Sequence, residues 1–173
     1  MEQEGEDLSA HLYGKYGTRG LDMLNDPNAY LYQAGRQVGI HFTKDRYIYP
    51  TQKAHALMEY AKEHVGVEVS NRIMEEMFTR YFEKGHNINS IDVLTEIATQ
   101  AGIDAQKATD AMKDGKNLKE VDDKDYLAKR RMGISGVPFF VLEKEGSQER
   151  PVGFSGAQPV DVMAEQLQEV ADA

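Results

Sequence analysis

The stretch Gly133-Ile134-Ser135-Gly136-Val137-Pro138-Phe139-Phe140-Val141-Leu142 decides the fold of this chain. Proline has no backbone N–H, so Pro138 marks a turn or the first residue of a strand and not the interior of a sheet. The residue before a proline is driven toward extended geometry. Val137 is therefore predicted to be extended, with backbone groups able to pair with another extended chain. Taken alone, the same residues also fit an ordinary trans proline that opens a buried strand.

Composition narrows the classes of function. The chain of 173 residues has 20 Lys and Arg against 29 Asp and Glu, a formal net charge of −9. This balance argues against nucleic acid or an anionic membrane surface as the main partner. The first residues are acidic and lack the basic and apolar regions of a secretory signal, so we expect a cytoplasmic protein. With no cysteine, the chain can form no disulfide, no cysteine zinc site and no thiolate nucleophile.

Periodicity and cap residues predict a mostly helical chain. The expected helices span about 9–16, 27–38, 51–65, 67–83, 90–101, 104–112, 118–132 and from 159 to the end. Thr51, Ser90 and Asp104 are the expected N-caps. The expected inward residues of the helix at 51–65 and of the last helix are Ala54, Leu57, Met58, Ala61 and Val65, and then Val162, Met163, Leu167 and Val170.

The predicted strands are few. Residues 40–43 are short and extended, 47–50 form a connector, and 139–142 and 151–154 form a hairpin around the turn at 144–147. A lone hairpin is marginal in water, and a continuously apolar strand is typical of one that has neighbours and is covered on both faces. Either 40–43 joins this sheet or a strand comes from outside the chain.

Four sequence blocks resemble the DsbA family. They are Glu4-Gly5-Glu6-Asp7-Leu8, the tract from Tyr81 to Ile88, Gly133 to Phe140, and Phe154-Ser155-Gly156-Ala157-Gln158-Pro159. The similarity is to the FrnE-like branch of thiol–disulfide oxidoreductases and isomerases, whose fold is shared with 2-hydroxychromene-2-carboxylate isomerases and kappa-class glutathione transferases. It extends from Glu4 to the C-terminus.

The resemblance implies an α/β, thioredoxin-like fold with a large helical insertion. It implies a single domain over 1–173, in which about 8–132 are mainly the insertion and 133–173 carry the cis-proline strand, the hairpin and the last helix. It also implies that Val137-Pro138 is cis, and that Gly136, Val137 and Pro138 contact substrate. The implied partner at this loop is an extended polypeptide or a glutathione-like thiol, without a cofactor.

The chain departs from the family pattern at its N-terminus. Family members begin with a strand, a Cys-x-x-Cys helix and a second strand, and nothing here corresponds to them. We therefore expect a shortened, redox-inactive member with an incomplete sheet, no catalytic residue and a retained peptide-binding loop. The exposed strand 139–142 would favour a homodimer. Two alternatives remain, a non-catalytic binding or scaffolding protein and a glutathione-dependent isomerase or transferase that uses serine.

Other candidate residues carry weaker signals. His55, Glu59 and His64 share a predicted helix, yet solvated surface fits them better than a metal site. Ser135 and Ser155 have no nearby histidine with a triad pattern, so no serine nucleophile is expected. The tyrosines at 13, 16, 47 and 49 could line a ligand groove or pack in the core.

Overall fold

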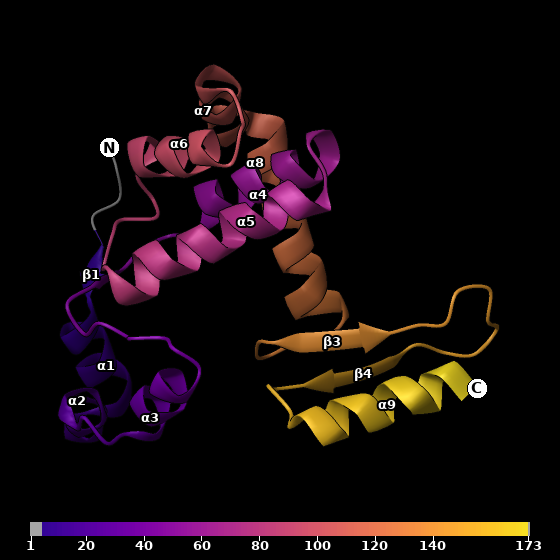
Figure 1. The fold of residues 1–173 in the computed structure, drawn as a ribbon, viewed down its shortest axis with the longest axis horizontal. Coiled ribbons are helices and arrows are strands. Elements are labelled where there is room, and N and C mark those ends of the chain that lie inside the picture. The colour runs from indigo at the N-terminus through magenta and orange to yellow at the C-terminus, as the bar shows by residue number, and fades with distance from the viewer. Residues whose placement is uncertain (1–4, 173) are drawn as a thin grey trace. The chain divides into compact units, whose positions relative to one another are not determined.

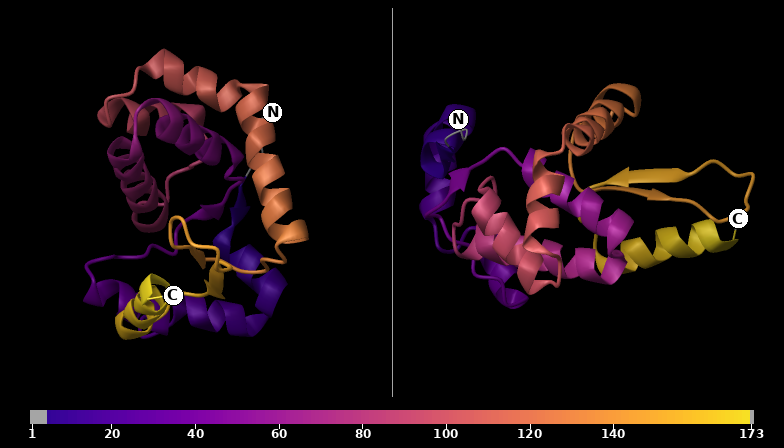
Figure 2. Two further views of the ribbon diagram at one scale, coloured as in Figure 1. Left: turned by 90° about the vertical axis from the view of Figure 1, so that its right-hand side faces the viewer. Right: turned by 90° about the horizontal axis from the view of Figure 1, so that it is seen from above.

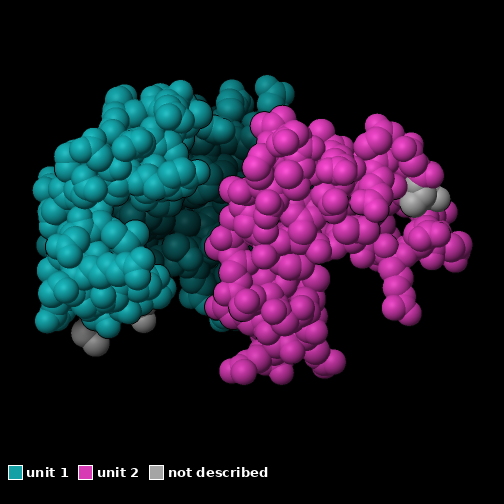
Figure 3. Space-filling view, turned by 90° about the horizontal axis from the view of Figure 1, so that it is seen from below, with its two compact units in different colours: residues 1–122 teal, residues 123–173 magenta. Residues whose placement is uncertain are grey.

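The computed structural model describes residues 5–172. The chain divides into two compact units, residues 1–122 and residues 123–173 (Figure 3). The boundary falls inside helix α8 (Gly115–Tyr126), which continues as the π-helical segment η2 (Leu127–Arg131). Each unit is described separately.

The first unit is almost entirely helical (Figure 1 and Figure 2). Up to α8, its elements are β1 (Glu6–Asp7), α1 (Leu8–Tyr16), α2 (Thr18–Asn25), α3 (Tyr30–Gln37), β2 (Tyr47–Ile48), α4 (Gln52–His64), α5 (Val67–Phe78), the π-helical η1 (Thr79–Glu83), α6 (Ile91–Gln100) and α7 (Ala105–Lys113).

The hydrophobic core of this unit lies among α4, α5, α6 and α7. Apolar residues recurring at helical spacing put one face of each helix into the core, as an amphipathic helix requires. The buried cluster is Ala54, Leu57, Met58, Ala61, Ile73, Met77, Leu94, Ile97, Ala98, Ile103, Ala108 and Met112. The expected inward face of α4 is thus confirmed except at Val65, which is 41% exposed. Val65 lies beyond the last helical residue, where it no longer follows the helical face.

Polar side chains cap the N-termini of two of these helices. Asp104 accepts hydrogen bonds from the N–H groups of Gln106 and Lys107, and Ser90 accepts one from Val93. Each satisfies backbone donors that a helix leaves free at its first turn. Thr51 holds the N-cap position of α4, but the prediction that its side chain caps the helix is wrong, since it makes no cap hydrogen bond.

A buried arginine joins α5, η1 and α6. The Nε of Arg80 donates to Glu76 Oε1 at 2.7 Å, and its Nη2 donates to Glu96 Oε1 at 2.9 Å and to Gln100 Oε1 at 3.0 Å. These charge-assisted bonds compensate for taking the guanidinium out of water. The hydrogen bond from Arg80 holds the pKa of Glu96 below its usual range.

The N-terminal part differs from the expected layout. The single helix predicted at 27–38 is shorter, Tyr30–Gln37, and the separate helix α2 precedes it. Residues 40–43 form no strand, whereas the expected connector contains β2, which pairs with β1 in the register Glu6↔Ile48 and Asp7↔Tyr47. These strands have only two residues each, too short for an alternation pattern to show in the sequence.

The second unit contains the end of α8, η2, the strands β3 (Phe139–Leu142) and β4 (Val152–Ser155), and helix α9 (Val160–Asp172). The predicted hairpin is confirmed, with the register Phe139↔Ser155 to Leu142↔Val152. Within residues 5–172, β4 is the only strand that pairs with β3, so 40–43 do not join this sheet. Helix α9 follows the hairpin as predicted and runs along it (Figure 1). Its Leu167 is 55% exposed, so that inward assignment is wrong.

Candidate functional site

The loop between η2 and β3 carries the predicted binding residues. Gly133 ends η2 with a φ of 68°, a left-handed conformation that glycine adopts without strain. The Ile134 N–H then donates back to the Ala128 carbonyl at 3.0 Å, which fixes the start of the loop. The Val137–Pro138 peptide bond is cis, and the N–H of Gly156 donates to the Pro138 carbonyl at 2.8 Å. Gly136, Val137 and Pro138 lie together on the surface, and Val137 is 90% exposed.

The register of the hairpin determines which backbone groups of β3 face outward. In an antiparallel pair, residues that exchange hydrogen bonds alternate with residues whose N–H and C=O groups point away from the partner. The bond between Gly156 and Pro138 sets this alternation, so Phe140 and Leu142 bond to β4. Phe139 and Val141 then direct their backbone groups away from β4, toward an edge that pairs with no other strand within residues 5–172.

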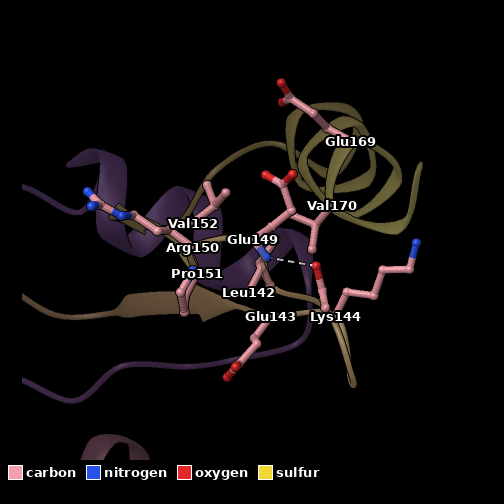
Figure 4. A pocket seen from close by; sticks show the side chains of 10 residues that line it. Leu142, Glu143, Lys144, Glu149, Arg150, Pro151, Val152, Glu169 and Val170 are labelled. Carbon is pink, nitrogen blue, oxygen red and sulfur yellow. Dashed lines mark hydrogen bonds between the residues drawn. The ribbon is translucent and has the colours of Figure 1, made fainter. Parts of the chain in front are cut away.

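Helix α9 packs on one face of the hairpin, and the other face is more exposed. Phe140 and Leu142 share one face with Phe154 and Val152, and the rings of Phe140 and Phe154 stack with centroids 5.2 Å apart. Leu142 and Val152 line a pocket of about 80 Å³ together with Val170 of α9. The charged side chains of Glu143, Arg150 and Glu169 point outward around it (Figure 4). Helix α9 therefore covers this face.

The opposite face carries Phe139 and Val141. The Phe139 ring lies over Gly153, where an added Cβ would come within 3.1 Å of the ring. Val141 is 49% exposed, although it is a β-branched residue in a strand. An apolar side chain left half in solvent next to an open strand edge is typical of a surface that binds another extended chain.

The site offers hydrogen-bonding backbone and apolar surface, and it offers no reactive group. The chain has no cysteine, and within residues 5–172 no cluster of histidine, aspartate or glutamate could hold a metal ion. His64 stacks on Tyr60 with ring centroids 4.5 Å apart, and its Nδ1 lies 3.1 Å from the Tyr60 carbonyl oxygen. Within the described residues, the side chain of His11 bonds to Glu6 and that of His64 to the Tyr60 carbonyl, and neither bond involves Ser135 or Ser155. The site therefore consists of backbone hydrogen-bonding groups and apolar side chains on the surface of the second unit.

Comparison with known proteins establishes the family. A profile of the DSBA-like thioredoxin domain matches residues 30–168, which is most of the chain. The chain belongs to the DSBA-like thioredoxin family. Its fold is similar to the crystal structure of a probable DsbA oxidoreductase from Streptomyces coelicolor, with a TM-score of 0.80 and 23% sequence identity. The similarity covers 99% of this chain and 70% of that one. A search of curated proteins found no match.

The family assignment confirms the thioredoxin-like, mostly helical fold. It does not test the division of the chain into an insertion and a C-terminal part, nor the roles of Gly136, Val137 and Pro138, which remain predictions. Among residues 5–172, no helix is both long and apolar enough to cross a membrane.

Sequence reasoning missed a cavity in the first unit. It is lined by residues of α1, α2 and α3 and by the loop that leads to β2, among them Tyr16, Tyr32, Phe42 and Arg46. Of the tyrosines proposed for a groove, only Tyr16 is among these described lining residues. The apolar residues of α2 and α3 also line the cavity, but the sequence does not indicate this because the cavity forms only when these short helices pack together.

Proposed function

We propose that this chain binds an extended polypeptide segment non-covalently, by strand addition at Val137-Pro138 and along the free edge of β3. The observation that carries the proposal is the alternation along β3, where Phe139 and Val141 direct their backbone groups away from β4, beside the half-exposed Val141 side chain and close in sequence to the exposed Val137. Backbone hydrogen bonds supply affinity in such complexes, and alternate side chains supply selectivity. The four sequence blocks support a place in the FrnE-like branch.

The proposed role is binding and not catalysis. Disulfide exchange begins with thiolate attack, and this chain supplies no thiolate. The loop that would hold a substrate strand is nevertheless present, with Pro138 anchored to Gly156 and Val137 projecting into solvent. We expect selectivity for segments whose alternate residues are apolar, since these would contact Phe139 and Val141.

A second copy of the chain is the alternative occupant of the same edge. Pairing two β3 strands would satisfy outward N–H and C=O groups that pair with no other strand within residues 5–172. Peptide binding and self-association should therefore compete, and excess peptide should shift any dimer toward monomer.

The test is fluorescence anisotropy with a labelled peptide of alternating valine and threonine. A matched peptide carries N-methyl groups on alternate backbone amides, which removes the donors on one edge but keeps the side chains. We expect saturable binding of the first peptide and at least about tenfold weaker binding of the second, equivalent to ~1.4 kcal/mol. Equal binding of both peptides would contradict strand addition. Replacing Val137 with alanine keeps the backbone groups and should leave most of the affinity.

A further inference from the structure

The first unit contains a mostly apolar cavity, with Arg46 in its wall. The cavity has a volume of about 290 Å³ and lies among α1, α2, α3 and the segment from Phe42 to Arg46. These helices are grouped at the lower left of Figure 1. Among the described lining residues, Arg46 alone is charged, and the others are apolar, aromatic or uncharged. The volume is just below the range for small-molecule sites, about 300–1,000 Å³.

The Arg46 side chain is positioned but incompletely bonded. Its guanidinium carbon lies 4.8 Å from the ring centroid of Tyr81 and 5.1 Å from that of Phe82, so two aromatic rings hold it by cation–π contacts. Its Nε is buried and has no hydrogen-bond partner within residues 5–172. Because this Nε is closed to solvent, a ligand in the cavity would bond to the terminal N–H groups of the guanidinium, which the two aromatic rings hold in place.

The other residues that line the cavity indicate the chemistry of the rest of the ligand. Tyr32 donates its hydroxyl hydrogen to the Leu24 carbonyl at 2.9 Å, and burial raises the pKa of its phenol, so it stays neutral. No other anion among the described lining residues competes for Arg46. At the mouth, Met23, Tyr30 and Leu31 remain exposed although they are large and apolar. The lining thus favours an apolar body with one anionic end.

We propose that this cavity binds a small carboxylic acid with an apolar body, whose carboxylate accepts hydrogen bonds from Arg46. A guanidinium matches a carboxylate in geometry and charge, because its N–H groups lie in one planar fork. The apolar body would lie against Leu12, Met23 and Phe42. This site is separate from the β3 edge, and its residues come from the first unit alone.

Isothermal titration calorimetry of the full chain with decanoate tests the proposal, with decanol as the uncharged control. We expect decanoate to bind at least about tenfold more tightly than decanol, equivalent to ~1.4 kcal/mol. Arg46→Met should lower the decanoate affinity to that of decanol and leave decanol binding unchanged. Arg19→Met removes the same charge from the exposed surface of α2 and should behave as the wild type.

Equal affinity of the wild type for decanoate and decanol would overturn the proposal, and so would the absence of saturable binding. Binding of a peptide with an apolar C-terminus, without binding of decanoate, would assign the cavity to a protein partner instead. If Arg46→Met fails to fold, NMR of the wild type decides. The Arg46 side-chain Nε–H resonance should shift with decanoate and not with decanol, and an unchanged resonance at saturation would refute the contact.

Discussion

Replacing Arg80 with methionine removes the polar link between α5, η1 and α6 while keeping most of the apolar stem. Arg80 is only 7% exposed and bonds to Glu76, Glu96 and Gln100. A hydrogen bond to a charged partner contributes about 1.5–3 kcal/mol, and a neutral one about 0.5–1.5 kcal/mol. Both carboxylates are partly exposed and return to water when the arginine is lost, which reduces the penalty. We therefore expect the free energy of unfolding to fall by ~2–3 kcal/mol at neutral pH.

The assay is urea unfolding followed by far-ultraviolet circular dichroism, repeated over the pH range in which both proteins fold. The pKa of Glu96 is lowered in the folded state, so its contribution is fully present above the pKa of the unfolded chain and is lost as pH falls through the folded value. The difference between wild type and Arg80→Met should therefore shrink below about pH 4, near the usual glutamate pKa. Glu96→Gln, the matched control, should destabilise less than Arg80→Met because its carboxylate is the more exposed partner.

A loss below about 0.5 kcal/mol, the range of an ordinary surface substitution, would refute this reasoning. So would a difference that is the same at neutral and acidic pH.

The remaining predictions concern the core, the sheet edge and the chemistry. Leu57→Ala should lower the free energy of unfolding in the same urea titration by about 2–5 kcal/mol, because Leu57 is fully buried. Leu127→Ala, at an exposed position, should change it by less than about 0.5 kcal/mol. Val141→Lys places a charge beside the open edge of β3 and should reduce self-association in sedimentation velocity, and a wild type that stays monomeric at every concentration would contradict the edge argument. The purified chain should give no insulin reduction above a protein-free control, because it has no cysteine. Turnover that persists after contaminants are removed would contradict this prediction.

The sequence predicted best those elements whose local chemistry and burial agree. Pro138 and the apolar run after it marked β3 at its observed bounds, and the caps Ser90 and Asp104 marked the starts of α6 and α7. The cis form of Val137-Pro138 came from the family resemblance, because local sequence alone favours the trans form.

What the sequence could not show depends on short elements and tertiary contacts. Helix α2 was missed because it has only eight residues and Gly20 is the third of them, and glycine disfavours a helix. Packing explains that glycine, since an added Cβ at Gly20 would lie within 2.5 Å of the Leu12 carbonyl oxygen. The cavity around Arg46 was also missed, because it forms only when α1, α2 and α3 pack together with the loop that carries Arg46.

The most direct test of the proposed function is the amide spectrum of β3 at saturation with the valine–threonine peptide. Strand addition predicts that the N–H groups of Val137, Phe139 and Val141 shift and become protected from exchange. Those of Phe140 and Leu142, already bonded to β4, should change little. Changes that follow no alternation along β3, or that leave Val137 unaffected while peptide binds elsewhere, would contradict the account.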